Sequence, residues 1–413
     1  MKTFRTRGNA TLLRRAMLGI VAQLLLSPAV HSQLGYRPEL QPCVEFLQNQ
    51  KTSAKDYILG LFADHDLVII CERHHPEVTQ YDLFLSVISD PRFIDSVGNV
   101  FTEIGTITQA AAVNTFVHAE GLSADSVDQA VLRFQRNCSD SPLWEKPNYS
   151  ALIRALYRLN QSLTSSRKVD LFNSDVPFDW SNIDEAGLRA FDKQIVDIRD
   201  SIIASQIIQK FDEIRASRST RHKALVIMNY RHAFRHDTKN SRGVTRRNVG
   251  RLLFDRYGER AANVYLNNLA LVSARADNDA TYAPIQGGKW DAAFRVTSTR
   301  DAGFDFKASP FGKDTFDIWP AKVKWTWEDE FDGFAFYRPL EEQKLVFGMA
   351  GFVDSAFAHE LARRYTVYRP RSDGRPWTTA DIEGLMRDHN RRREMPIDNL
   401  DSLNAEIRRW LSL

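Results

Sequence analysis

The sequence predicts an α/β fold with a mostly parallel central sheet flanked by helices, a long insertion and a helical C-terminal tail. Two observations lead to this prediction. After residue 56, short apolar runs alternate with long amphipathic stretches, as expected for parallel strands joined by crossover helices. Several of these runs also end abruptly in charged or amide residues, which is typical of strands whose carboxyl ends reach a ligand-binding edge.

The N-terminus has the pattern of a secretory signal peptide over residues 1–32. Five basic residues precede an apolar run from Ala16 to Leu26, and small residues follow up to Ser32. This run is too short to cross a bilayer comfortably, and no later segment approaches about 18 uninterrupted apolar residues. We therefore expect an exported protein, periplasmic or extracellular, with no transmembrane segment in the mature chain.

Removing this leader changes the charge and the expected redox environment. The formal charge of +3 becomes about −2 when the five basic residues leave, so the sequence gives no reason to expect nucleic-acid binding. Export permits disulfides, and Cys43, Cys71 and Cys138 are available. Because Cys71 lies on an apolar strand, Cys43 with Cys138 is the one pairing left to test.

The chain divides into an N-terminal segment (33–56), an α/β domain (57–340) and a charged helical C-terminal extension (341–413). The longest predicted helix covers 184–216, where isoleucines recur at helical spacing. Six strands are predicted, over residues 67–71, 99–104, 169–173, 224–229, 262–267 and 333–337.

Residues 277–327 differ in composition, since Gly, Pro, Asp and Trp dominate there. A loop of this length is usually functional or ordered by its own side chains, and we expect it to cover the site. Its four tryptophans are predicted to pack in the core and in this lid: Trp290, Trp319, Trp325 and Trp327.

The first strand ends in Cys71-Glu-Arg-His-His75, where a carboxylate and two imidazoles follow an apolar run. An extended backbone would put Glu72 and His74 on one side, whereas an early helical turn would favour Glu72 with His75. Spacing therefore leaves the choice of histidine open. Cys71 is predicted to be a packing residue, because an apolar strand hides a thiol and raises its pKa.

Polar residues also end three further strands. Since the carboxyl ends of parallel strands meet at one edge, we expect these side chains to converge with Glu72. They are Glu103, Asp175, and the group Asn229, Arg231 and His232.

This mixture suits activation of water against a carbonyl, because it combines a base that titrates near neutrality with carboxylates and cationic or amide donors. Arg246 and Arg247, near the predicted start of the next helix, suggest an additional pocket for an anionic part of a small-molecule or peptide substrate. The same edge could instead hold a divalent metal, with Glu72, His75, Glu103 and His232 as its ligands.

In these motifs the sequence resembles the superfamily of erythromycin esterase, ChaN and Tiki/TraB proteins, closest to the esterase-like and ChaN-like branches. Cys71-Glu-Arg-His-His75 is similar to its opening Gly-Glu-x-His or Gly-Glu-x-x-His motif. Glu103 in Phe-Thr-Glu-Ile-Gly and Asn229-Tyr-Arg-His232 resemble its second and later motifs. Residues 249–258 and 331–337 are similar to the following helix and the final strand, so the resemblance spans roughly residues 57 to 340.

The resemblance implies that Glu72, Glu103 and His232 occupy functional positions and that His74 or His75 is the first histidine. It implies hydrolysis with a histidine base in the esterase branch, a metal-dependent peptidase in the Tiki branch, and haem in ChaN. Cys71 stands where the motif has glycine, and Arg73 adds a charge. Three expectations follow: an ester or amide hydrolase, a metal or haem-iron binding protein without hydrolytic activity, or an interaction module on a decayed site.

Overall fold

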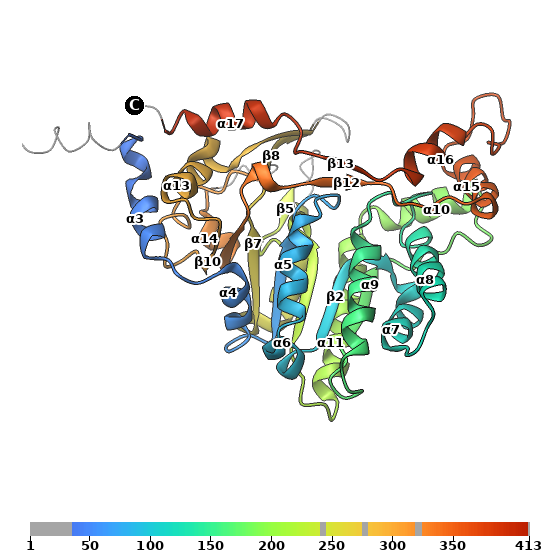
Figure 1. Cartoon of the computed structure of the whole chain (residues 1–413), viewed down its shortest axis with the longest axis horizontal. Coiled ribbons are helices and arrows are strands. Elements are labelled where there is room, and N and C mark those ends of the chain that lie inside the picture. Colours follow the sequence, from blue (N-terminus) through green and yellow to red (C-terminus); the bar gives the residue numbers. More distant parts are fainter. Residues whose placement is uncertain (1–34, 240–244, 275–279, 319–323, 412–413) are drawn as a thin grey trace, which may run out of the picture.

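The computed structural model describes residues 35–239, 245–274, 280–318 and 324–411 (Figure 1). The predicted signal peptide and Trp319 lie outside these ranges. Among the described residues, none of the helices has the length and apolar character needed to cross a membrane. The predicted fold class is confirmed, because a seven-stranded sheet has the order β10-β11-β7-β1-β4-β2-β3 and all its pairs are parallel except β10 with β11.

Six of the seven strands coincide with predicted strands to within two residues at either end, and β10 was not predicted. The strands are β1 (Leu67–Glu72), β2 (Asn99–Thr106), β3 (Asp170–Asp175), β4 (Ala224–Asn229), β7 (Ala261–Leu266), β10 (Asp301–Asp305) and β11 (Gly333–Tyr337). β1 lies in the middle and is buried along its whole length. Its alternate residues enter two separate cores, Leu67, Ile69 and Cys71 on one face and Val68 and Ile70 on the other.

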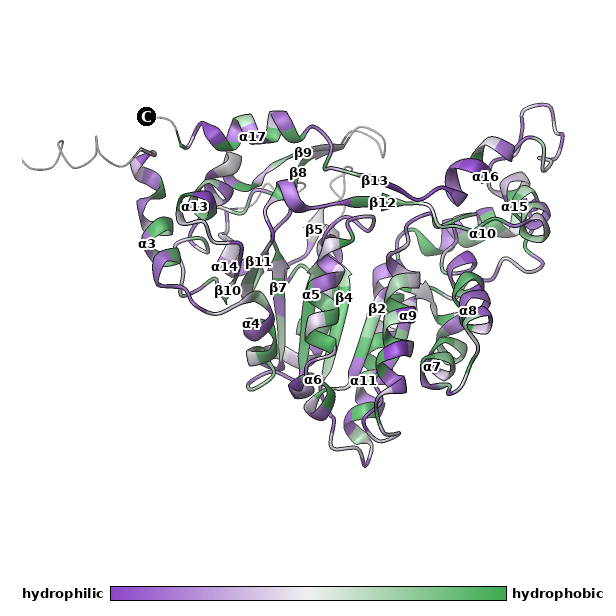
Figure 2. Ribbon diagram, in the orientation of Figure 1, coloured by the Kyte–Doolittle hydropathy of each residue, from purple (hydrophilic) through white to green (hydrophobic). Residues whose placement is uncertain are grey.

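Helices cover both faces of the sheet, and their apolar sides turn towards it (Figure 2). One layer contains α4 (Ala54–Leu61), α5 (Thr79–Ile88), α6 (Pro91–Ser96), α7 (Ala110–His118), α8 (Ala124–Arg136) and α9 (Asn148–Gln161). The other contains α3 (Gln41–Asn49), α11 (Arg199–Ala216), α12 (Val249–Tyr257), α13 (Lys289–Thr297) and α14 (Trp327–Glu330).

The long helix predicted over 184–216 is in fact two helices, α10 (Glu185–Ile195) and α11. The break falls at residues 196–198, where Val196 and Ile198 are 60% and 42% exposed. The isoleucine pattern was therefore misleading at Ile198, which does not face the core. The break matters for the site because it places Arg199 and Asp200 in the first turn of α11.

The described part of the 277–327 insertion belongs to the body of the fold. It supplies β9 (Ala280–Pro284), which pairs with β8 (Leu269–Ala274), and then α13 and β10. Trp290 and Trp327 are buried in an aromatic cluster of this core, as predicted. Trp325 stacks on His236, with ring centroids 4.8 Å apart.

The C-terminal extension forms a strap across the top of the sheet in Figure 1. Its strands β12 (Leu345–Phe347) and β13 (Arg393–Met395) pair antiparallel, between α15 (Ser355–Tyr368) and α16 (Glu383–Asn390) at one end and α17 (Leu400–Arg408) at the other. The Val346 amide donates to the Pro76 carbonyl (2.7 Å), and the Val78 amide donates to that of Lys344 (3.0 Å). The strap is thereby hydrogen-bonded to the turn that follows β1.

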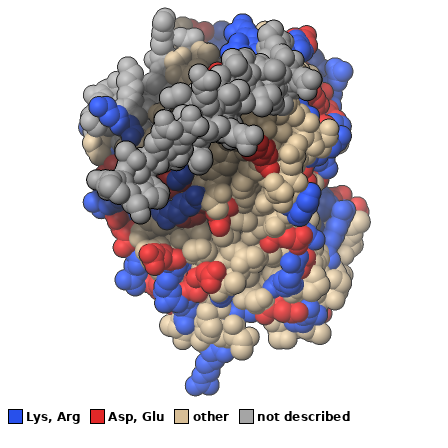
Figure 3. Space-filling view, turned by 90° about the vertical axis from the view of Figure 1, so that its left-hand side faces the viewer, with Lys and Arg blue, Asp and Glu red and all other residues tan. Residues whose placement is uncertain are grey.

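All three cysteines are free and buried, so the Cys43–Cys138 pairing is wrong. The two residues pack in different cores, on opposite faces of the sheet. Cys71 is also buried, and burial raises the pKa of its thiol well above the ordinary range. On the face shown in Figure 3, basic and acidic side chains are interspersed.

Candidate active site

Glu72 is the last residue of β1 and is only 1% exposed. Strand alternation puts it on the same face as Val68 and Ile70, the face covered by α5 and α9. Its Oε1 accepts hydrogen bonds from the Tyr81 hydroxyl (2.7 Å) and from Nδ2 of Asn148 (3.2 Å). Its Oε2 lies 2.8 Å from Nδ1 of His75. The Glu72 carboxylate is therefore held in one orientation by groups from two helices and one turn.

His75 is the histidine that meets this carboxylate. Because Nδ1 of His75 lies within hydrogen-bond distance of Glu72, the proton of a neutral imidazole is assigned to Nδ1, and Nε2 keeps its lone pair. The ring packs against Trp144, with centroids 5.0 Å apart. The turn after β1 therefore brings His75, and not His74, next to Glu72.

His74 lies apart from this arrangement. Its ring meets the edge of Tyr282 (4.7 Å between centroids) and lines a different cavity. Burial, together with His75 and Arg231, lowers the pKa of His74 to about 4. Of the two adjacent histidines, only His75 is paired with Glu72.

Glu103 lies on β2 at the same edge. Its Oε2 accepts a hydrogen bond from the backbone N–H of Asn229 (2.7 Å), and its Oε1 forms ion pairs with His232 (3.3 Å) and Arg199 (3.6 Å). Burial alone would raise the pKa of Glu103, but His232, His75 and Arg199 together lower it well below its usual range. Glu103 is therefore a buried carboxylate surrounded by cationic groups.

His232 lies in the single 3-10 turn, Tyr230–His232, that follows β4. Its Nε2 faces Glu103, and its Nδ1 lies 2.9 Å from Oδ1 of Asp200, in an ion pair without hydrogen-bond alignment. Burial opposes protonation, yet Asp200 and Glu103 raise the pKa of His232 to about 10. Both ring nitrogens of His232 therefore face carboxylates, which favours the protonated imidazole.

Arg199 closes the far side of the cluster. Its Nε and Nη2 each donate to one oxygen of Asp175 at 2.9 Å. Although burial favours the neutral guanidine, Asp175 and Glu103 raise the pKa of Arg199 further. Asp175, predicted as a substrate contact, thus holds Arg199 next to Glu103.

Asn229 organises the neighbouring turn. Its Nδ2 donates to the Arg73 carbonyl (3.1 Å), and its Oδ1 accepts from the backbone N–H of Arg231 (3.2 Å) and from Nε of Arg231 (3.3 Å). Both ends of the amide are therefore occupied. Arg231 is exposed, and its guanidinium borders the cavity.

A cavity of about 330 Å³ lies in front of these groups. This volume is near the lower end for small-ligand pockets. Residues around it include His75, Glu103, Trp144, Asp175, Arg199, Arg231 and His232, together with Asp140 and Lys146.

Two predictions about this cavity differ from the structure. No described residue of the 277–327 insertion lines it, because that segment packs into the core beside β11. Arg246 and Arg247 are also absent from its walls, since Arg246 forms an ion pair with Asp197 and Arg247 with Asp255. Both arginines therefore already have acidic partners.

The residues of the site that were missed from sequence include Tyr81, Asn148, Asp140, Arg199 and Asp200. Each lies on a helix or loop outside the strand-end motifs, so no local pattern marks it. Asp140 is notable because burial, together with the nearby Asp175, raises the pKa of its carboxyl group.

Part of this cluster also fits a divalent cation. Glu72, His75 and Glu103 each offer one ligand atom, and these three atoms lie within 4.8 Å of one another. Two carboxylates and an imidazole are a donor set that zinc and similar ions accept. His232, the fourth predicted ligand, is not part of this set, and its ring nitrogens face Glu103 and Asp200.

No family model matches this sequence, and no curated protein matches it significantly. The solved structures that match include an erythromycin esterase mutant in its open conformation, with 13% identity, 73% of this chain and 96% of the other covered, and a TM-score of 0.45. A Bacillus cereus protein also matches, with 10% identity, 72% of this chain and 97% of the other covered, and a TM-score of 0.42. So does a succinoglycan biosynthesis protein, with 8% identity, 72% of this chain and 96% of the other covered, and a TM-score of 0.43. The esterase belongs to one of the groups that the sequence motifs resemble.

Proposed function

We propose that the protein is an exported hydrolase that cleaves an ester or amide with a water molecule activated by His75. The observation that carries this proposal is the 2.8 Å contact between Nδ1 of His75 and Oε2 of Glu72 beside a cavity. A buried carboxylate on Nδ1 fixes the ring and stabilises the imidazolium that forms when Nε2 accepts a proton.

The reaction follows from this pairing. Nε2 of His75 takes a proton from water as the water oxygen bonds to the substrate carbonyl carbon, and the carbonyl oxygen becomes an oxyanion. When this intermediate collapses, the bond from carbon to the leaving oxygen or nitrogen breaks. The leaving group takes the proton from His75, so one water is consumed and the imidazole returns to its starting state.

The opposite wall of the cavity would stabilise the oxyanion. Arg231 borders the same space and would donate to the oxyanion, whereas His232 has both ring nitrogens against Asp200 and Glu103 and would contribute only its charge. A fixed cationic donor in a partly buried site lowers the energy of a developing negative charge. Asn229 would act as a positioning residue, because both ends of its amide already bind the two turns that meet there.

The experiment compares two adjacent histidines, His75→Asn and His74→Asn, in hydrolysis of p-nitrophenyl acetate and of an aminoacyl p-nitroanilide. Loss of a general base should lower kcat/KM by about 10²- to 10⁴-fold in His75→Asn. His74→Asn should lose less than threefold. The proposal fails if the wild-type protein hydrolyses neither class of substrate, or if the two variants lose activity equally.

A second candidate is binding of a divalent cation by Glu72, His75 and Glu103, because their ligand atoms converge within 4.8 Å. A bound cation would supply Lewis acidity to the cavity. The side chains of Tyr81 and Asn148 would then keep Glu72 oriented toward that position.

Elemental analysis of the purified protein and calorimetric titration with Zn²⁺ separate the two candidates. Stoichiometric metal that Glu103→Gln and His75→Asn both lose would support cation binding. Hydrolysis that survives exhaustive chelation, with no metal bound, would exclude it and support the histidine base.

A further inference from the structure

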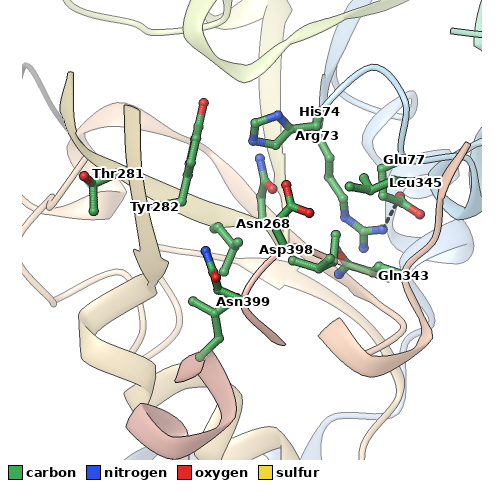
Figure 4. Close-up of a pocket in the computed structure, with 13 residues that line it drawn as sticks. Arg73, His74, Glu77, Asn268, Thr281, Tyr282, Gln343, Leu345, Asp398 and Asn399 are labelled. Carbon is green, nitrogen blue, oxygen red and sulfur yellow. Dashed lines mark hydrogen bonds and ion pairs between the residues drawn. The ribbon is translucent and has the colours of Figure 1, made fainter. Parts of the chain in front are cut away.

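A second cavity, of about 370 Å³, lies on the other side of the turn that follows β1 (Figure 4). Its walls come from the segment after β7, from β9, and from the strap and the start of α17. No residue lines both this cavity and the one beside His75. The two are therefore separate spaces at one edge of the sheet.

The strongest charges in its wall cancel each other. Nη1 of Arg73 donates to Oε2 of Glu77 at 2.8 Å, and both side chains are about 1% exposed. Nε and Nη2 of Arg73 donate to Asn267 and to the carbonyl of Tyr337. This ion pair is part of the wall, and the fold binds it on three sides.

Asn268 is different, because its amide nitrogen lacks a hydrogen-bond partner among the described residues. Its side chain is 8% exposed, and Nδ2 is buried without a hydrogen bond to any described residue. A buried donor without an acceptor destabilises the fold, and such groups are rare in folded proteins. In Figure 4 the amide nitrogen points into the cavity, towards the ring of His74 and beside Asp398.

The rest of the wall is mainly apolar. Leu269, Leu345, Ile397 and Leu403 line it, and the ring of Tyr282 lies across from the strap. Asp398 is exposed at the edge, and its carboxylate would repel an anion. A fitting molecule thus has an apolar body, no negative charge, and an acceptor for Nδ2 of Asn268.

We propose that this cavity binds a small uncharged molecule that carries a carboxamide or lactam edge on an apolar ring. The carbonyl oxygen would accept the free hydrogen bond of Asn268. The N–H of the same edge would donate to Asp398 or to the ring of His74, both of which lie next to Asn268 in Figure 4. The ring would pack against Tyr282 and the leucines.

Three probes of equal shape and different charge test this site: benzamide, benzoate and benzylamine, measured by ligand-observed NMR and calorimetry on the full-length protein. Benzamide should bind with the low affinity of a fragment, at least tenfold tighter than the other two. Asn268→Leu should weaken benzamide binding at least tenfold. His75→Asn should leave it intact, because His75 lines the other cavity.

If Asn268→Leu does not fold, Leu403→Trp tests the same site. The tryptophan fills the cavity from α17 and should abolish benzamide binding. The proposal is overturned if benzamide does not bind at millimolar concentration or if benzoate or benzylamine binds as well. It is also overturned if His75→Asn removes binding while Asn268→Leu keeps it.

Discussion

Glu72 and Arg73 are neighbours at the end of β1, carry opposite charges and are equally buried, yet their surroundings differ. The Arg73 guanidinium binds groups inside the fold: Glu77, both oxygens of Asn267, and the carbonyl of Tyr337. Glu72 is bound by Tyr81, Asn148 and His75, and His75 in turn borders a cavity. Arg73 thus joins the ends of neighbouring strands, and Glu72 orients the imidazole of His75.

This comparison shows that burial of a charge does not by itself identify a site. Both side chains satisfy the rule that buried charges are paired and hydrogen-bonded. The difference lies in the partner, because Glu77 is as buried as Arg73 whereas His75 is partly exposed. A buried charge supports chemistry when its partner has an atom left to face a substrate.

The largest effect should come from Glu77→Gln, which leaves the Arg73 guanidinium without its counter-ion. Breaking a buried ion pair from one side costs about 3–5 kcal/mol of unfolding free energy. Urea unfolding followed by circular dichroism measures this. A loss below about 1 kcal/mol, the range of exposed pairs, would show that the pair does not support the fold.

Glu72→Gln should lower the hydrolytic activity rather than the stability of the fold. It keeps the shape of the side chain but removes the charge that stabilises the His75 imidazolium, so kcat/KM should fall by about 10³-fold. The rate should fall far more than the stability does, which is the opposite of Glu77→Gln. Equal activity of Glu72→Gln and wild type would contradict the proposed base.

A smaller effect is expected at His232, whose pKa is raised from 6.5 to about 10 by Asp200 and Glu103. A raised pKa stabilises the fold fully below pH 6.5, and this contribution disappears as pH rises through about 10. His232→Gln should therefore lose on the order of 2 kcal/mol at neutral pH relative to wild type.

Urea unfolding of both proteins across this range measures the difference. The gap between wild type and His232→Gln should close toward pH 10. A gap that stays constant with pH would mean that His232 is uncharged in the folded protein.

The smallest effect should follow from Tyr81→Phe, which removes one hydrogen bond to Oε1 of Glu72. A single hydrogen bond to a charged group contributes about 1.5–3 kcal/mol, and Asn148 remains as a second donor. We expect roughly a tenfold lower kcat/KM, with the same pH profile. A shifted profile would mean that this hydrogen bond also sets the pKa of the Glu72–His75 pair.

The sheet was largely predictable because continuous apolar runs mark strands buried on both faces. β10 was missed since Asp301-Ala-Gly-Phe-Asp305 is short and begins and ends in aspartate. The break between α10 and α11 was missed because residues 196–198 contain neither glycine nor proline. No local propensity therefore marks the break.

The site was predictable only in part. Glu72, Glu103 and His232 were predictable from strand ends, since parallel strands bring their carboxyl ends together. The choice of His75 over His74 depended on one turn, and the turn depends on contacts with the strap. Asp200 could be found only in three dimensions, because a helix break places it beside His232.

The position of β1 has a consequence for how the chain reaches its native state. Both strands that flank it, β4 and β7, come from the second half of the sequence. Such distant pairing makes folding slow, because long loops must close first. During synthesis the central strand therefore stays unpaired until β4 has emerged at residue 229, and its second edge stays open to aggregation until β7 follows at residue 266.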